Sequence, residues 1–136
     1  MMTPARTSFI FHIARFLAAV ILLQTLYFKF TGSSESVYIF TTVGMEPWGR
    51  FVVGGAELVA GLLLVIRPTA WLGAMLALGL MAGAIMMHLT ILGIQVLGDG
   101  GYLFSLAWMV TLSSAYVLWH DRDVVKHRLT AMLGRG

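Results

Sequence analysis

Residues 54–88 read GGAELVAGLLLVIRPTAWLGAMLALGLMAGAIMMH, two long apolar runs separated by the short break RPT. Proline cannot continue the interior of a helix, so this break predicts a tight turn between two helices. A helix needs roughly 20 residues to cross a bilayer, because each residue adds ~1.5 Å and the hydrocarbon core is ~30 Å thick. Both runs approach or exceed that length. Glu57 stands alone among small and apolar neighbours, and His88 ends the second run.

The composition of the whole chain indicates an integral membrane protein. Its 136 residues are 59% hydrophobic and only 11% charged, with a mean hydropathy of +0.87. A soluble domain carries roughly a quarter charged residues, so these charges could not cover a globular surface. Cysteine is absent, which excludes disulfides, thiolate metal sites and thiol redox chemistry. The formal net charge is +3, but the basic residues are scattered or near span ends, so we expect no nucleic-acid partner.

The apolar runs predict an all-α integral membrane four-helix bundle in a single transmembrane domain covering residues 1–136. Backbone groups in the bilayer core must be hydrogen-bonded internally, so each run should be a helix. Residues 31–48 contain an apolar stretch too short to cross, which should lie along the interface or cap the bundle. The four expected spans are residues 8–30, 49–66, 70–97 and 101–119, followed by a basic tail at 120–136.

The distribution of Lys and Arg predicts that both termini lie in the cytoplasm. Cytoplasmic loops carry an excess of basic residues, and four spans return the chain to the side on which it began. The basic residues on the expected cytoplasmic side are Arg6, Arg67, Arg122, Lys126, Arg128 and Arg135.

Polar residues are expected at similar depths in the outer half of the bundle. Glu57 lies nine residues after Trp48 and His88 nine residues before Leu97, which places each ~13–14 Å from the outer face. By the same count Thr111 lies at ~15 Å and Gln24 at ~9 Å.

Small residues indicate which helix faces pack inside the bundle. Gly54 and Gly61 flank Glu57 at helical spacing and let a neighbouring helix approach closely. Small residues also share a helical face with His88, so both polar side chains should point inward; they are Gly73, Ala77 and Ala84. Gly79 and Gly83 form a further small-residue pair suited to association with another helix.

A carboxylate inside a membrane must be protonated or paired, because an isolated charge costs on the order of 3 kcal/mol or more there. Glu57 could be neutral, or ionised against His88, Lys29 or Arg15. Arg15 lies toward the inner side and is the poorer partner by depth. A buried Glu–His hydrogen bond could also serve only to fix the helix register. Lys29 and Arg15 near span ends are equally compatible with interface anchors.

The predicted site has a catalytic part and a ligand-binding part. Glu57 and His88 are the predicted catalytic residues, which handle protons, and ligand contacts are expected from Gln24, Lys29, Trp108 and Thr111. The residues predicted to have structural roles are Arg15, Gly54, Gly61, Gly79 and Gly83.

Cofactor assignments remain broad at this stage. Glu57 and His88 offer too few ligands to indicate a metal site. His12 and His120 both fall near the inner end, but their spacing does not require a haem. Trp108 and the methionines of MAGAIMMH are either packing residues or the walls of a quinone slot.

The order of several motifs resembles the DoxX family of small four-helix bacterial membrane proteins. Arg15 is followed by YFKF with Lys29, then IFTTVGMEP, then residues 54–88, then GDGGYLFSLAW. The resemblance covers Arg15–Leu118, and Arg15, Lys29, Glu57 and His88 match the family pattern by position. The stretch LQTLYFKF lacks a glycine that many members carry before the lysine, and VLWHDRD with its basic tail replaces their small-residue ending.

The resemblance implies a protein of the bacterial cytoplasmic membrane with a link to redox chemistry. The family takes its name from a subunit associated with thiosulfate–quinone oxidoreduction, and other members are linked to membrane redox complexes and oxidative-stress defence. We therefore expect a redox-associated subunit whose Glu/His pocket binds a quinone-like or other small ligand, and a quinone-linked membrane oxidoreductase is one complex to which such a subunit could belong. The alternatives are a non-enzymatic scaffold, partnered by redox subunits or by copies of itself, and transport of a small solute or protons.

Overall fold

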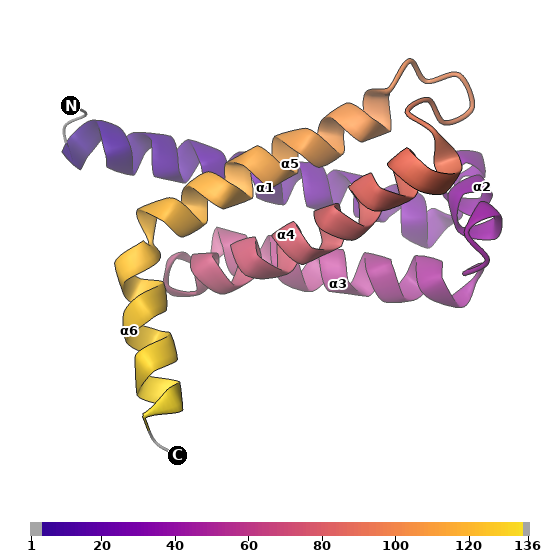
Figure 1. Ribbon diagram of the computed structural model, residues 1–136. Helices are drawn as coiled ribbons and strands as arrows, with labels where there is room; N and C mark the ends of the chain where they lie inside the picture. Colours follow the sequence, from indigo (N-terminus) through magenta and orange to yellow (C-terminus); the bar gives the residue numbers. More distant parts are fainter. Residues whose placement is uncertain (1–3, 135–136) are drawn as a thin grey trace.

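The computed structural model describes residues 4–134 and the side chains of residues 8–134. These residues form an all-α structure, which confirms the all-α part of the predicted fold class (Figure 1). The helices are α1 (Pro4–Thr31), α2 (Ser34–Thr42), α3 (Trp48–Val65), α4 (Ala70–Met87), α5 (Tyr102–His120) and α6 (Arg122–Leu133). The short turn η1 (Arg67–Thr69) leads into α4, and the π-helical turn η2 (His88–Leu92) follows it.

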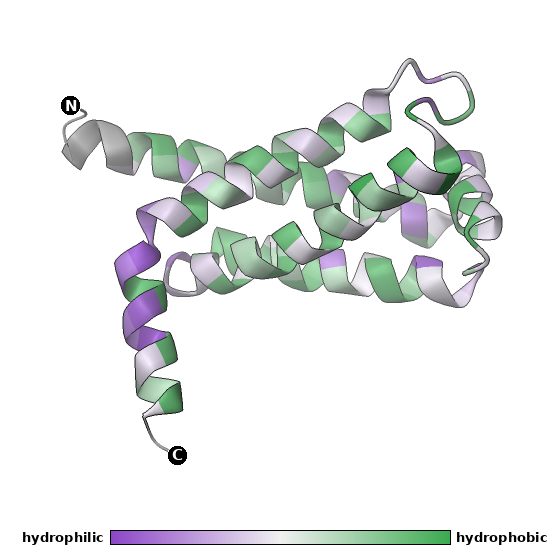
Figure 2. Ribbon diagram, in the orientation of Figure 1, coloured by the Kyte–Doolittle hydropathy of each residue, from purple (hydrophilic) through white to green (hydrophobic). Residues whose placement is uncertain are grey.

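Four helical stretches are long and apolar enough to cross a membrane: Ser8–Thr31, Trp48–Val65, Arg67–Leu92 and Tyr102–His120. Figure 2 shows these stretches largely in the hydrophobic colour, whereas α6 begins with hydrophilic residues. Three of the stretches end within two residues of the predicted spans. The third ends at Leu92 rather than at Leu97, because Gly93 adopts a φ of +80°, which a helix cannot continue.

The four long helices α1, α3, α4 and α5 pack around a common core, and neighbouring helices run antiparallel (Figure 1). α1 and α4 each pack against both α3 and α5. The α2 helix and the loop of residues 93–101 lie at one end of the structure, and η1 and α6 lie at the other (Figure 1). The predicted cap over the first end is α2, which contacts α1, α3 and η2.

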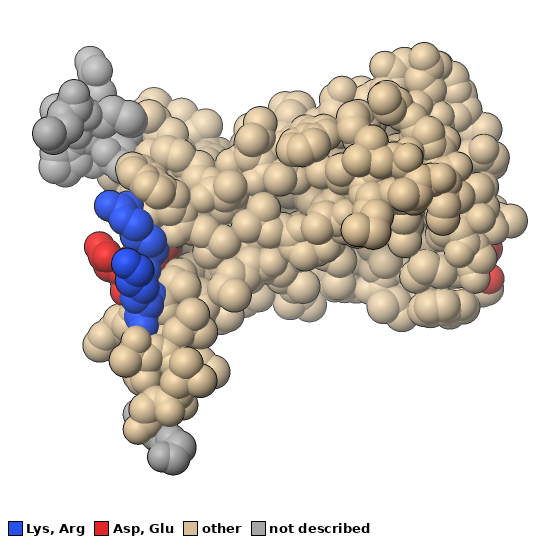
Figure 3. Space-filling model, viewed as in Figure 1, with Lys and Arg blue, Asp and Glu red and all other residues tan. Residues whose placement is uncertain are grey.

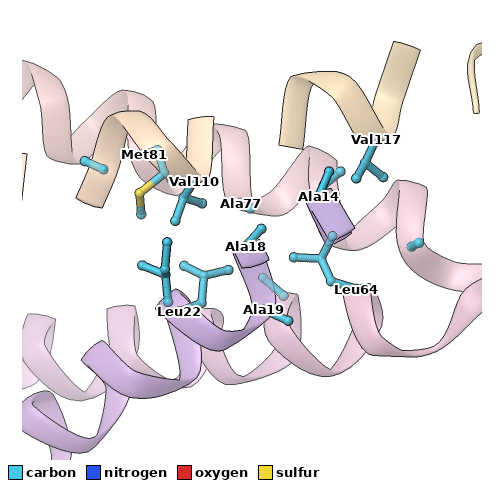
Figure 4. Packing of buried hydrophobic residues seen from close by; sticks show 14 of the residues in the cluster. Ala14, Ala18, Ala19, Leu22, Leu64, Ala77, Met81, Val110 and Val117 are labelled. Carbon is cyan, nitrogen blue, oxygen red and sulfur yellow. The ribbon is translucent and has the colours of Figure 1, made fainter. Parts of the chain in front are cut away.

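Small side chains fill much of the core. Ala18, Ala60, Ala74 and Ala77 are fully buried, which allows the helix backbones to approach closely. One close approach lies between α3 and α4, where a Cβ on Gly73 would stand 2.7 Å from the backbone nitrogen of Leu64. Larger side chains complete the packing between these alanines (Figure 4); they include Leu22, Leu64, Met81, Val110 and Val117.

Arg15 joins α1 to the end of α3. The sequence predicted a structural role for this residue, with an interface anchor as one alternative. Its side chain is only 6% exposed, and Nη1 donates to the carbonyl oxygens of Leu64 (3.0 Å) and Val65 (2.7 Å). These carbonyls belong to the last turn of α3 and have no partner within that helix. Nε donates to Nδ1 of His12 at 2.9 Å.

Candidate ligand-binding cavity

A cavity of about 620 Å³ lies between the four long helices at the end covered by α2. This volume falls within the range of small-molecule sites, roughly 300–1,000 Å³. Most of the wall is apolar, with Leu22, Phe40, Met81 and Val110 among the lining residues. The polar groups come from Gln24, Thr25 and Lys29 of α1, Glu57 of α3, His88 of η2 and the first turn of α2.

Glu57 and Lys29 form an ion pair in the wall of this cavity. Nζ of Lys29 lies 3.1 Å from Oε1 of Glu57, whose residue is only 3% exposed. The hydroxyl of Thr25 lies 3.4 Å from the other carboxylate oxygen and 3.0 Å from the carbonyl oxygen of Leu22, so its single proton serves one acceptor at a time. Thr25 and Lys29 reach the same carboxylate because residues four apart share a helix face.

His88 lines the same cavity but does not bond to Glu57. Its Nδ1 lies 2.9 Å from the carbonyl oxygen of Gly93, and a carbonyl can only accept, so Nδ1 carries the proton in this bond. The ring also meets Phe104 edge to face, with centroids 5.4 Å apart. The structure thus differs from the expected Glu–His contact: Lys29, one of the three partners considered, reaches the carboxylate, while the turn at Gly93 engages the imidazole.

The predicted ligand contacts divide into two groups. Gln24 and Lys29 line the cavity, whereas Trp108 and Thr111 are not among its lining residues. Trp108 is exposed on α5 and packs edge to face on Phe104. The Thr111 hydroxyl donates to the carbonyl oxygen of Ala107 in its own helix at 2.7 Å. Depth along the helix was a poor guide for these two residues, because it says nothing about direction around the helix axis.

The four predicted structural glycines also differ in their surroundings. A Cβ on Gly54 would lie 2.9 Å from Phe30, and one on Gly61 would lie 2.9 Å from Leu23, so both glycines permit close packing of α3 on α1. A Cβ on Gly79 or Gly83 would meet nothing within 4 Å. Both residues are exposed and line the cavity, so this part of α4 is not packed against another helix of the chain.

Sequence reasoning missed part of the site. Thr25 was detectable, because it stands four residues before Lys29 on α1. The contribution of α2, through Ser34, Glu35 and Phe40, carried no comparable signal. A short helix between spans shows its position only once the spans have packed.

Residues 10–90 match the model of the DoxX family, a range that covers more than half of the 136 residues and includes Arg15, Lys29, Glu57 and His88. This chain belongs to the DoxX family. The matched range contains α2, α3 and α4 but ends before α5, so the α5 wall of the cavity lies outside it. No curated protein and no solved structure matches the chain.

Proposed function

We propose that this DoxX protein is a redox-associated membrane subunit that binds a small lipid-soluble ligand of the quinone class in the cavity. The observation that carries the proposal is the combination of a largely apolar space of about 620 Å³ with the Lys29–Glu57 pair and His88 in its wall. An apolar wall with a few convergent polar groups is typical of small-molecule sites.

The side chains of the cavity suit a planar conjugated ring that carries carbonyl oxygens. A quinone supplies two such oxygens, which take up protons on reduction. The Lys29 ammonium and the Thr25 hydroxyl are donors suited to one oxygen. His88 uses Nδ1 toward Gly93, which leaves Nε2 free to accept or return a proton at the ligand. Glu57 holds Lys29 in place and supplies a second proton acceptor.

We further propose that the four long helices cross the bacterial cytoplasmic membrane as a four-helix bundle with both termini in the cytoplasm. Lys and Arg gather at the α6 end of the face shown in Figure 3, as the excess of basic residues on the cytoplasmic side requires. In this orientation the cavity lies in the outer half of the bundle. The exposed Gly79 and Gly83 would leave it accessible from the bilayer.

The proposal is tested by titrating a short-chain ubiquinone into the full-length protein in detergent and measuring its dissociation constant. The double variant Lys29→Gln/Glu57→Gln removes both charges while keeping side-chain volume, so it should fold but bind at least tenfold more weakly. Thr111→Val is the matched control, because Thr111 is a polar span residue outside the cavity wall. Wild-type affinity in the double variant would rule out the assigned polar site.

The exposed glycines favour a scaffold role as a second candidate function. Gly79 and Gly83 present an unpacked small-residue face on α4, which a helix of a partner subunit or a second copy could contact. Gly83→Leu should then abolish co-purification of the partner, whereas the Lys29/Glu57 double variant should leave it intact. Transport has no comparable support, since apolar residues such as Ala18, Leu64 and Ala77 are fully buried in the core between the helices (Figure 4).

A further inference from the structure

The direction of α6 sets it apart from the four long helices. It follows α5 after Asp121 and runs steeply across the end of the structure, and its C-terminal part reaches beyond α3 (Figure 1). If the four long helices cross the membrane, a helix in this direction lies along the membrane surface. The part beyond α3 then overhangs the lipids beside α3 and α4.

A groove of about 730 Å³ separates α6 from the turn between α3 and α4. Trp71 and Leu72, in the first turn of α4, line one side, and Arg128 and Met132 of α6 line the other. The groove therefore combines apolar side chains with one guanidinium. Tryptophan at the end of a span is typical of the level of the lipid headgroups.

Arg128 is the basic residue of α6 that belongs to this groove. It stands three and four residues before Ala131 and Met132, so the three share one side of the helix. Within the described residues Arg128 has no hydrogen bond or ion pair. Arg122, by contrast, donates to the carbonyl oxygen of Trp119 at 2.7 Å, and Arg67 pairs with Asp121 at 3.2 Å. Among the side chains that the structure describes, Arg128 is thus an unpaired cation beside an apolar wall.

We propose that this groove binds an anionic phospholipid of the cytoplasmic leaflet. The guanidinium of Arg128 pairs with the headgroup phosphate, and an acyl chain lies along the exposed side chains of Leu72 and Met132, beside the largely buried Trp71. The cytoplasmic leaflet carries the negative surface charge that attracts basic segments next to a span. This assignment rests on the proposed membrane crossing, but it is independent of any ligand in the cavity near Glu57.

Native mass spectrometry of the full-length protein in a nonionic detergent tests the site. Phosphatidylglycerol and phosphatidylcholine with identical acyl chains are titrated separately, and the bound fraction is compared. We expect wild-type protein to retain phosphatidylglycerol preferentially and Arg128→Gln to retain it about fivefold less, the typical effect of one basic residue near an anionic surface. Arg128 has no partner among the side chains of residues 8–134, so the thermal unfolding of this variant should match that of wild type.

Lys126→Gln provides the matched control. It removes the same charge from the same helix, but Lys126 stands two residues from Arg128 and is not in the groove wall. Retention in Lys126→Gln should stay close to wild type. Equal losses of phosphatidylglycerol in the two variants would mean general attraction to the helix. Equal retention of the two lipids would mean no selection for an anionic headgroup. Either result would overturn the site. Ubiquinone binding by Arg128→Gln is expected to be unchanged. This measurement separates a failure of the lipid-site proposal from a failure of the proposed quinone binding in the cavity.

Discussion

Arg15 and Arg50 each donate hydrogen bonds to backbone carbonyls at the C-terminal end of a neighbouring helix, Arg15 from α1 to α3 and Arg50 from α3 to α1. Arg15, in the first half of α1, donates to the last carbonyls of α3, and Arg50, at the start of α3, donates to the Lys29 carbonyl near the end of α1. The two helices are antiparallel, so each arginine meets the C-terminal end of its neighbour. Cations at helix C-termini are stabilised by the helix dipole and by the carbonyls that have no partner within the helix. The paired contacts also fix the height of Lys29 relative to Glu57.

Replacing Arg15 should destabilise the protein strongly. Arg15→Gln removes a buried guanidinium that serves Leu64 and Val65, and hydrogen bonds to charged groups contribute about 1.5–3 kcal/mol each. We expect the free energy of unfolding, measured by denaturant titration in mixed micelles, to fall by about 2–4 kcal/mol. Arg122→Gln is the control, because Arg122 serves one exposed carbonyl, that of Trp119. Similar losses of unfolding free energy in the two variants would contradict a stabilising contact between Arg15 and the C-terminal end of α3.

The Lys29–Glu57 pair should show strong coupling in a double-mutant cycle. Glu57→Gln alone leaves the Lys29 ammonium facing a neutral amide in the cavity wall, and breaking a buried pair in this way costs about 3–5 kcal/mol. Lys29→Gln/Glu57→Gln removes both charges, so its unfolding free energy should lie closer to wild type than the sum of the single changes predicts. The same denaturant titration gives all four values. Additive single effects would mean that the two side chains do not interact.

Much of the fold was predictable because the bilayer limits the possibilities. Apolar runs long enough to cross a membrane must be helical there, and the RPT break had to be a turn. Gly54 and Gly61 were also predictable, since small residues at helical spacing indicate close helix contact, and both meet side chains of α1. The end of α4 was not, because residues 93–97 are apolar apart from Gln95, while Gly93 turns the chain.

The candidate site was predictable in its location but not in its contacts. Counting residues placed Glu57 and His88 at one depth, and both line the cavity. The partner of Glu57 depends on side-chain length and on rotation around α1, which bring the long Lys29 side chain to the carboxylate. Gly93, five residues after His88, holds the imidazole through a turn that no periodicity reveals.

The α3–α4 contact should tolerate no side chain at Gly73. A Cβ there would lie 2.7 Å from the Leu64 nitrogen and 2.8 Å from the Ala60 oxygen, and backbone atoms cannot move aside as a flexible side chain can. Gly73→Ala should lower the unfolding free energy by about 1–3 kcal/mol, the usual cost of overpacking. Gly55→Ala is the matched control, since a Cβ there meets nothing within 4 Å. A Gly73→Ala protein with the unfolding free energy of wild type would show that α3 and α4 can move apart with little loss of stability.

Asp99 organises the loop before α5 through three backbone amides. Its Oδ1 accepts from the nitrogens of Val96 (3.0 Å) and Gly101 (2.8 Å), and Oδ2 accepts from that of Leu103 (3.2 Å). Partial burial alone would raise the pKa of this carboxyl, but the amide donors outweigh it and hold the pKa below its ordinary value. The ionised form therefore stabilises the folded state at pH values above the unfolded pKa of about 3.9, and this stabilisation is lost as pH falls through the lower folded pKa.

Acidification should release this loop, and the effect should belong to Asp99. The amide resonances of Gly101 and Leu103 should titrate together, with a midpoint below the ordinary aspartate value, when followed by NMR from pH 6 downward. Asp99→Asn keeps an acceptor oxygen but loses the charge, so at pH 6 it should be less stable than wild type by about 1 kcal/mol, the typical effect of a helix cap. The stability gap between the two proteins should then narrow as pH falls below about 4, because protonated aspartic acid is also neutral. Subtracting the unfolding free energy of Asp99→Asn from that of wild type at each pH cancels the contribution of the other carboxylates, which both proteins share. A gap that stays constant down to pH 3, or a midpoint at or above the ordinary value, would show that the amides do not favour the ionised carboxylate.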